Sequence, residues 1–456
     1  MFRFRKGSSW NNSVSNLPPG PRTIPILGNL HMMDLKKPYK TMMEWSKEYG
    51  PIFRIRLGFQ EMVVLTGYET VKEALVNQGD AFAERASIPL FENGTKGFGL
   101  VFAHGENWKV MRRFTLSTLR EHGMGRKPFD ITTILTAAVS NIIISIVLGK
   151  RYEYEDAKFL QLLKANSENF QLSGSPAMLL YNLFPMLRFL LATPKSMIKN
   201  QNEVHDFIQT ILKQYLQDLD ENDQSNLIES FLVRQREENM KMKNDGYFCN
   251  ENLLSLVDDL FGAGTETMAN TMRWAILLMM KYPEIQSKVQ EEIAKEIGDI
   301  QPTTEDRAKM PHTNAVIHEI QRFADIVPTN LPHETAMDVT FKGFLIPKGT
   351  HIIPLLTSVL HDESQWEKPH DFYPEHFLDS EGKFVKRDAF MPFSAGRRIC
   401  AGENLAKMEL FLFFTSLLQK FTFQPPLGIS KDDLDLTPCV GLTSPPMPYK
   451  TCAVLR

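Results

Sequence analysis

Hydrophobic residues recur along most of the chain with the three-to-four-residue spacing of amphipathic helices. Two short stretches, residues 63–67 and 340–349, instead show the pattern of strands bounded by turns. The longest helical pattern covers residues 253–282 and ends at Pro283, which predicts a helix of about 30 residues and about 45 Å. A helix of that length can cross a whole domain. The pattern therefore predicts a predominantly helical protein with few strands.

Two apolar stretches need an interpretation of their own. Residues 131–149 carry no charge and could be mistaken for a membrane span. Polar side chains such as Thr136, Ser140 and Asn141 favour a buried core helix there instead. Residues 176–191 are also apolar, but Pro185 interrupts them.

Composition limits the class of protein. The 456 residues contain no evident linker, repeat or low-complexity tract, which favours one large core. The hydrophobic content of 43%, with 31 Phe and 22 Met, suits such a core and also an adaptable apolar cavity, although Met is more often plain core filler. A net charge of −3 gives no reason to expect nucleic acid as a partner.

The four cysteines lie far apart in the sequence. Cys249, Cys400, Cys439 and Cys452 show no CxxC spacing, so neither a disulfide framework nor a zinc site is indicated. A reducing compartment fits this usage best.

Residues 393–402 carry the most specific chemistry. Gly396 and Gly402 allow a tight loop, and Cys400 stands at the entrance of a predicted helix, where nearby N–H groups stabilise a thiolate. Arg398 can reach a carboxylate. A haem needs both an iron ligand and cationic partners for its propionates, so the segment predicts a haem site. The alternative is a buried structural cysteine after a glycine turn.

This segment matches every fixed position of Phe-x-x-Gly-x-Arg-x-Cys-x-Gly, from Phe393 to Gly402. It resembles the haem signature of the cytochromes P450, and the resemblance extends from residue 17 to the C-terminus. The sequence around the signature is similar to that of the microsomal family 2 enzymes, subfamily K among them. The resemblance implies a mainly α cytochrome P450 fold with a small β-rich part, as a single haem-thiolate domain over residues 17–456. Residues 1–16 are interpreted as a basic and polar leader. It also implies a b-type haem on Cys400 and monooxygenase activity.

Within the longest predicted helix, residues 261–267 place glycines in mid-helix, where each costs about 1 kcal/mol relative to Ala. The resemblance implies that this part lies beside the haem, with Thr267 holding a water and Glu266 linking it to solvent for proton delivery. The alternative is a small-residue helix contact, with Glu266 solvated and Thr267 bonded to a backbone carbonyl.

A second helix is predicted to carry Glu319 and Arg322 on one face. Such a pair is usually a surface ion pair worth little. The resemblance implies instead a buried structural pair that supports the haem loop. Its third member in the family is normally an Arg, and His376 stands at that place here.

Further haem contacts come from the resemblance. Trp108 and Arg112, spaced i,i+4, match a helix that binds a propionate; His333 and, less specifically, Lys96 match other contacts. The alternatives are a packing Trp, a surface Arg and an ordinary polar His.

The implied substrate contacts fall in residues 88–102, 171–176, 261–267, 327–331 and 442–444. The pocket residues expected among them are Phe98, Phe102, Phe261, Ala263, Val327, Leu331 and Leu442. Their character indicates an apolar pocket for fatty acids, steroids or xenobiotics and does not select among these classes.

The resemblance also implies partners and a location. Electrons would come from NADPH through cytochrome P450 reductase, with cytochrome b5 as a second donor, and O2 would be the co-substrate. The basic dock for the donor would comprise Arg113, Arg120, Arg126, Lys127 and Lys407. The expected site is the cytoplasmic face of the endoplasmic reticulum membrane, with peripheral contact by residues 176–191.

Two departures from the family are expected to matter. Residues 1–6 are short and charged where microsomal members carry an apolar anchor, and Lys127 follows Arg126 directly where the family has a segment the length of one helix. Loss of that helix would expose apolar faces at a cost of several kcal/mol. A haem-binding but catalytically impaired variant is therefore the alternative function, and a helical scaffold without cofactor is a third.

Overall fold

The computed structural model describes residues 17–88, 98, 101–111, 133–184, 193–218, 225–240 and 246–456. Its α-helices are α1 (Pro38–Tyr49), α2 (Tyr68–Lys72), α5 (Thr133–Leu148), α6 (Ala157–Ser173), α7 (Pro176–Leu183), α8 (Thr193–Asp218), α9 (Leu227–Met240), α10 (Asn250–Lys281), α11 (Pro283–Glu296), α12 (Pro311–Ala324), α13 (Thr357–Leu360) and α14 (Glu403–Lys420). Residues 105–111 are helical as well.

The strands are short. They are β1 (Ile52–Leu57), β2 (Gln60–Leu65), β3 (Glu84–Arg85), β4 (His333–Glu334), β5 (Val339–Phe341), β6 (Phe344–Ile346), β7 (His351–Pro354), β8 (Phe421–Gln424) and β9 (Cys452–Leu455). Single turns of tighter or wider helix are η1 (Leu30–Met32), η2 (Glu73–Asn77), η4 (Thr304–Lys309), η5 (Pro374–Phe377), η6 (Gly396–Arg398) and η7 (Lys431–Asp433). Helices dominate, which confirms the predicted mainly α class with a small β-rich part.

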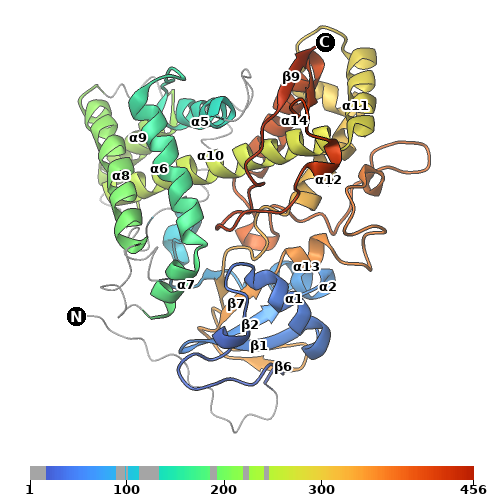
Figure 1. Ribbon diagram of the computed structural model, residues 1–456. Helices are drawn as coiled ribbons and strands as arrows, with labels where there is room; N and C mark the ends of the chain where they lie inside the picture. The colour runs from blue at the N-terminus through green and yellow to red at the C-terminus, as the bar shows by residue number, and fades with distance from the viewer. Residues whose placement is uncertain are drawn as a thin grey trace.

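Helix α10 organises the molecule. Its 32 residues run through the centre, with α6, α8 and α9 at one end and α11 and α14 at the other (Figure 1). It packs against α5, α8, α12 and α14. Pro283 begins α11 and cannot continue the preceding helix, so the predicted long helix and its end are both confirmed.

Two hydrophobic cores lie along α10. One joins its C-terminal half to α11, α12 and α14, and the other joins its N-terminal half to α5, α6, α8 and α9. Helix α5 contributes to both cores, which confirms that the uncharged stretch is a core helix. Each fully buried large side chain contributes about 1.5–3 kcal/mol, so these cores hold the helices in place.

The β-rich part lies beside the helices, with α1 and α2 (Figure 1). Its main sheet has the strand order β1-β2-β7-β4-β3, in which β2 and β7 are parallel. Residues 63–65 fall in β2, and residues 340–346 form the antiparallel β5–β6 hairpin, as the strand patterns predicted. The pairing of β3 with β4 matters most for the site, because it joins chain segments about 250 residues apart.

Several predicted features lie outside the described residues: the leader 1–16, Lys96, Arg112, Arg113, Arg120, Arg126, Lys127 and the junction at which a helix is expected to be missing. Among the helices that the structure does describe, none combines the length and the apolar character needed to cross a bilayer.

Candidate active site

A cavity of about 400 Å³ lies between α6, α8, α10 and α14. This volume is in the range of ligand pockets. Its wall brings together predicted residues from across the sequence: Phe102, Trp108, Ala263, Thr267, Val327, Leu331, Phe393, Arg398, Cys400, Gly402 and Leu442. The walls are predominantly apolar, so the cavity suits an apolar molecule with a few polar anchors.

Cys400 lies on the cavity wall, and its side chain is exposed there. The loop that carries it is closed by a hydrogen bond of 3.0 Å from the Cys400 N–H to the carbonyl of Phe393. Helix α14 begins three residues later, so its positive end lies close to the sulfur and stabilises a thiolate. On the cavity wall, the sulfur would, as a thiolate, suit a soft or borderline metal.

Gly396 is the glycine that this loop requires. Its φ is +75°, and a Cβ at this position would lie 1.7 Å from the carbonyl oxygen of Leu75. Any side chain would therefore collide with the backbone of η2 and push the loop away.

Arg398 is held from three sides. Its guanidinium lies 3.6 Å from the centre of the Trp108 ring, a cation–π contact, and it donates to the carbonyls of Ala83 (2.7 Å) and Ala103 (2.9 Å). Arg398 and Trp108 both line the cavity. Arg398 and Trp108, two of the predicted haem contacts, therefore form one cationic patch on the cavity wall.

His333 lies next to this patch, because β4 pairs it with Arg85 of β3. Its Nδ1–H donates to the carbonyl of Phe82, and its Nε2 is buried without a hydrogen-bond partner. Burial, aided by the charges of Arg85 and Arg398, lowers the pKa of His333 well below its ordinary value, so the ring is neutral. An anion placed here would favour the imidazolium form and supply the missing partner.

Arg85 also lines the cavity, and sequence reasoning missed it. It donates to the carbonyls of Val101 (3.2 Å) and Leu331 (3.1 Å) and is 6% exposed. The surrounding residues have no periodic pattern, so only the β3–β4 pairing reveals that this side chain is close to the cavity.

Thr267 faces the cavity from α10. Its hydroxyl donates to the carbonyl of Ala263 at 2.7 Å, a bond that a water or ligand can replace. The neighbouring glycines serve helix packing. A Cβ at Gly264 would lie 2.7 Å from Ile143 of α5, and one at Gly262 would lie 3.2 Å from Asn166 of α6. Close contact with α5 and α6 therefore offsets their helix-propensity cost.

Glu266 is placed differently from its expected role. Its carboxylate accepts a bond of 2.9 Å from Asn270, only 4% of the residue is exposed, and it is not among the described residues that line the cavity. Thr267 and Met268, the next two residues of α10, both line the cavity, so Glu266 lies just beyond the edge of the face that α10 turns toward it. Burial raises the pKa of Glu266. The carboxyl is neither solvated nor beside the cavity.

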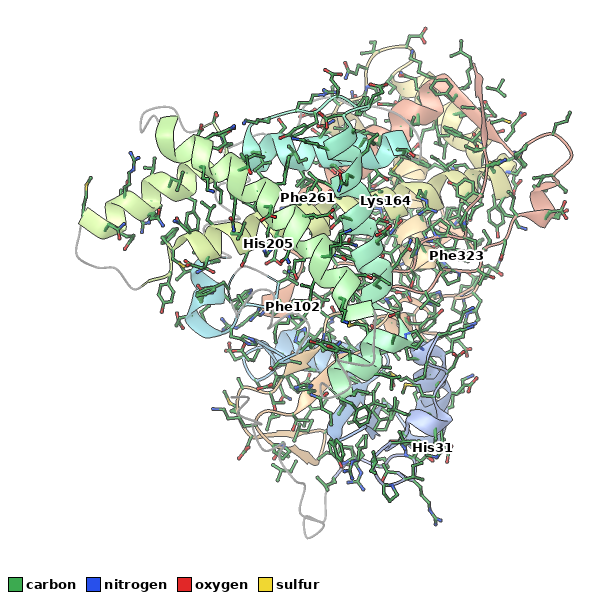
Figure 2. All side chains as sticks on the ribbon, turned by 60° about the vertical axis from the view of Figure 1, so that its left-hand side comes forward. His31, Phe102, Lys164, His205, Phe261 and Phe323 are labelled. Atoms are coloured by element: carbon green, nitrogen blue, oxygen red, sulfur yellow. The ribbon has the colours of Figure 1, made fainter. Side chains whose placement is uncertain are left out.

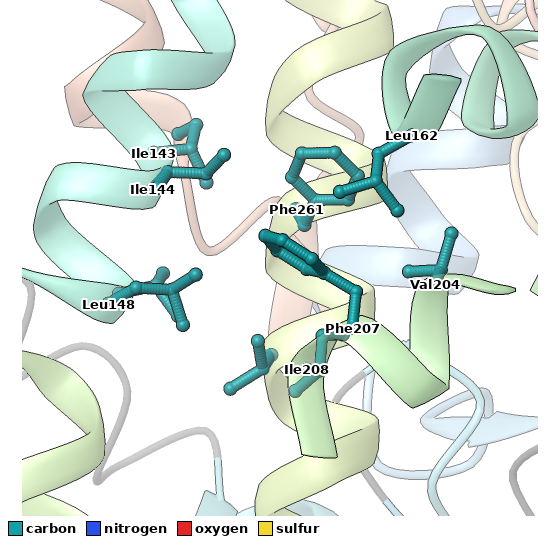
Figure 3. Close-up of a pocket in the computed structure, with 10 residues that line it drawn as sticks. Ile143, Ile144, Leu148, Leu162, Val204, Phe207, Ile208 and Phe261 are labelled. Carbon is teal, nitrogen blue, oxygen red and sulfur yellow. The ribbon is translucent and has the colours of Figure 1, made fainter. Parts of the chain in front are cut away.

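Phe261 likewise points elsewhere. It lines a small apolar pocket that adjoins the large cavity, with Leu162 of α6 and Phe207 of α8, and these side chains point toward one another (Figure 3). Neither Phe261 nor Phe98 is among the described residues that line the large cavity. Phe261 packs α10 onto α6 and α8.

Glu319 and Arg322 form a fully buried pair. Arg322 donates to both oxygens of Glu319 (2.7 and 2.8 Å) and to three carbonyls, so all five of its N–H groups are used. Those carbonyls belong to Leu360, Pro369 and Asp371, which lead toward the Cys400 loop. The expected buried pair, and not the surface alternative, is what the structure contains.

His376 completes this network where the family has Arg. Its Nε2 accepts from the Lys368 N–H at 3.1 Å, so its Nδ1–H is the donor to Glu319 at 3.2 Å. A neutral imidazole therefore satisfies the same carboxylate without a second cation.

Glu409 is a second residue that sequence reasoning missed. It lies on α14, lines the cavity, and both of its carboxyl oxygens are buried without a hydrogen-bond partner. Burial raises its pKa to about 8, so it is largely protonated at neutral pH. Its sequence signal is that a charged residue stands inside the apolar run from Met408 to Phe411, a position at which burial is expected.

Comparison with known proteins identifies the family. The sequence model of the family Cytochrome P450 matches residues 18–128 and 119–453. The chain belongs to the cytochrome P450 family. It is 49% identical to cytochrome P450 2K6 of Danio rerio, with 95% of this chain and 90% of that protein covered. It is 47% identical to cytochrome P450 2K1 of Oncorhynchus mykiss (100% and 95% covered) and 44% identical to cytochrome P450 2C5 of Oryctolagus cuniculus (97% and 95% covered). It is thus a family 2 cytochrome P450 and a haem monooxygenase.

The alignments bear on the expected internal deletion. The alignment with cytochrome P450 2K1 spans 479 positions although this cytochrome P450 has 456 residues, so the relative carries residues without a counterpart here. The two matched segments overlap at residues 119–128, where the missing helix is expected. That part of the chain lies outside the described residues, and the deletion of a whole helix stays a prediction.

Proposed function

We propose that this cytochrome P450 inserts one oxygen atom from O2 into apolar substrates, with electrons from NADPH through cytochrome P450 reductase and with cytochrome b5 as a second donor. The observation that carries the proposal is the exposed thiol of Cys400 at the start of α14, on the wall of a 400 Å³ cavity. When bound, b-type haem supplies the iron that activates dioxygen, and a thiolate ligand favours O–O cleavage.

The residues around the cavity fit this cofactor. Cys400 would ligate the iron, and Arg398, Trp108, Arg85 and His333 would hold the propionates. The guanidinium groups of Arg85 and Arg398, both on the cavity wall, support carboxylates at this place, and they would neutralise the charge. His333 is not among the described residues that line the cavity, so its contact stays a prediction. Phe393, Gly396 and Gly402 shape the loop against the ring. Arg112 and Lys96 remain predicted contacts.

Thr267 would hold a water beside the reacting centre. Its hydroxyl is bonded only to a carbonyl of its own helix and lies on the cavity wall, which supports this role. Glu266 could contribute only through intervening waters, because its carboxylate is buried elsewhere. Glu409, a lining residue that is largely protonated at neutral pH, is a second candidate proton source.

The substrate would lie against Phe102, Ala263, Val327, Leu331 and Leu442. These side chains leave mostly apolar surface, which supports fatty acids, steroids or xenobiotics as substrate classes.

We propose peripheral contact with the endoplasmic reticulum membrane on its cytoplasmic side. An exposed apolar surface supports it: Ile26 is 60% exposed, Leu27 42% and Phe59 57%. The Gly58 N–H donates to Leu27, and the Phe59 ring lies 5.7 Å from that of Phe184, just after α7, so these residues are neighbours. Apolar side chains gathered like this favour insertion into a lipid surface.

The test is the difference spectrum of the reduced, carbon-monoxide-bound protein. We expect the red-shifted Soret band of a thiolate-ligated haem, and we expect Cys400→Ser to abolish the shift while leaving the fold intact. Turnover of a laurate and steroid panel with NADPH and reductase then tests the electron source. Absence of haem, or haem without the shift, would contradict the proposal. No observation on the described residues favours the alternative of an impaired variant.

A further inference from the structure

A carboxylate lies against the guanidinium of Arg398. The Oε1 of Glu84 is 3.6 Å from the Nη2 of Arg398, and only 2% of the arginine side chain is exposed. Arg398 donates to the carbonyls of Ala83 and Ala103, the residues directly before Glu84 and His104, so both of these side chains are brought beside it. Because little water reaches the guanidinium, the charge of Glu84 acts on it with weak screening.

Hydrogen bonds fix the Glu84 carboxylate in this place. Its Oε1 accepts from the His104 Nδ1–H at 2.9 Å and from the Arg85 N–H at 3.1 Å, and its Oε2 accepts from the Gly105 N–H at 3.2 Å. Burial alone would raise the pKa of Glu84, but these hydrogen bonds outweigh it and lower the pKa. Glu84 is therefore an anion at neutral pH and is held in one orientation.

This anion stands behind the cationic side of the cavity. Arg85 and Arg398 line the cavity, whereas Glu84 is not among the described lining residues. Figure 2 shows Phe102, which also lines the cavity, between the helices above it and the β-rich part below. The Arg85 side chain donates to the neighbouring Val101 carbonyl at 3.2 Å. An anion bound in the cavity would therefore meet the arginines, and Glu84 would act on it through them.

The charges around Glu84 indicate what it does to such an anion. Its cross-strand neighbour on β4 is Glu334, whose described ion pair is with His351 at 3.6 Å. Glu84 is instead 3.6 Å from Arg398, so it offsets part of the positive charge that haem propionates would meet. Reduction adds an electron, which nearby positive charge stabilises and nearby negative charge destabilises. Less positive charge at the propionates therefore disfavours the reduced haem.

We propose that Glu84 is a positioning residue that acts on the haem through Arg398. Its carboxylate holds the guanidinium on the Trp108 ring and offsets part of its charge, and it thereby favours ferric over ferrous haem. No covalent bond forms or breaks: ferric iron takes up one electron from the reductase, and Glu84 sets how readily it does so. This assignment rests on the proposed monooxygenase function and adds a control of its first electron transfer.

The test is an anaerobic spectroelectrochemical titration of the haem-loaded protein at pH 7.5, with dithionite as reductant. Glu84→Gln removes the charge and keeps an oxygen that can accept from the Gly105 N–H. We expect it to raise the ratio of ferrous to ferric haem at a fixed potential about five-fold. Glu84→Asp keeps the charge and should stay within about two-fold of the unchanged protein. An unchanged or lowered ratio in Glu84→Gln, or an equal rise in Glu84→Asp, would overturn the assignment.

Glu106→Gln is the matched control. Glu106 is two residues from His104, but its side chain is 65% exposed and pairs with Lys109 at 2.6 Å. Water and salt screen its charge, so the ratio should change by less than about two-fold. Equal shifts in the two glutamine variants would reveal a general effect of net charge and contradict the role of Arg398. A lowered unfolding temperature of Glu84→Gln with an unchanged ratio would assign Glu84 a structural role instead.

The carbon-monoxide spectrum of the same samples separates the two proposals. A thiolate band together with an unchanged ferrous-to-ferric ratio in Glu84→Gln contradicts the role of Glu84 alone. Absence of the band in the unchanged protein contradicts the proposed function and, with it, the role of Glu84.

Discussion

Single residues decide whether the Cys400 loop can form. Gly396 and Gly382 both have positive φ, +75° and +76°, but their surroundings differ. A Cβ at Gly396 would lie 1.7 Å from a backbone oxygen, whereas a Cβ at Gly382 would meet nothing within 4 Å. We expect Gly382→Ala to cost about 1 kcal/mol from backbone strain alone. Gly396→Ala should cost roughly 3 kcal/mol or more and lower the haem content. Urea unfolding and the haem-to-protein absorbance ratio check both; similar costs would contradict the packing argument.

A buried acid links stability to pH. The pKa of Glu409 is raised to about 8 in the folded protein from an ordinary value of 4.5. The folded state therefore binds the proton more tightly, and stability should fall as pH rises from about 4.5 to 8, by up to about 4 kcal/mol. Glu409→Gln keeps the shape without the ionisation and should remove this part of the pH dependence. Unfolding free energies at pH 5 and pH 8 provide the check, and identical slopes would rule out the buried ionisation.

At the scale of elements, the hydrogen bonds of Arg322 join α12 to the segment that leads to the Cys400 loop. All five donors of Arg322 are used, and no part of its side chain is exposed. We expect Arg322→Lys to destabilise the protein by about 3–5 kcal/mol, because a lysine leaves buried acceptors unpaired. Arg234→Lys is the control: this side chain is 47% exposed and pairs with Glu238, so it should change stability by less than about 1 kcal/mol. Chemical denaturation of the two variants measures both.

The elements differ in how far sequence pattern predicts them. Helix α10 was predicted nearly to its ends, because its apolar positions recur over many turns and Pro283 ends it. Strands β3 and β4 have two residues each, too few for a periodic pattern. These strands are defined by the pairing of Arg85 with His333, and this pairing places Arg85 beside the cavity. Residues in such elements are visible only once the fold is known.

At the scale of the whole molecule, His205 of α8 and Asp258 of α10 join two helices that enclose the cavity. The hydrogen bond to Asp258 raises the pKa of His205. Because the pKa of His205 is higher in the folded than in the unfolded protein, the stabilisation by this pair is complete below about pH 6.5. It is lost as the pH rises through the pKa of the folded state. Hydrogen exchange in α8, corrected for intrinsic rates, should therefore accelerate between pH 6 and pH 9. Asp258→Asn should show little of this change, and an equal acceleration in both proteins would contradict the pairing.

The sequence by itself determined the class of protein. The helical periodicity predicted a mainly α protein, and the resemblance of the Cys400 segment to the cytochromes P450 implied the fold of that family and a haem monooxygenase. The tertiary structure decided which side chains reach the cavity. Thr267 reaches it and Glu266 and Phe261 do not, because the packing of α10 against α5 and α6 sets which face of the helix is turned toward the cavity. Glu409 emerged for the same reason: burial without a partner depends on neighbours from distant parts of the chain, which no local pattern records.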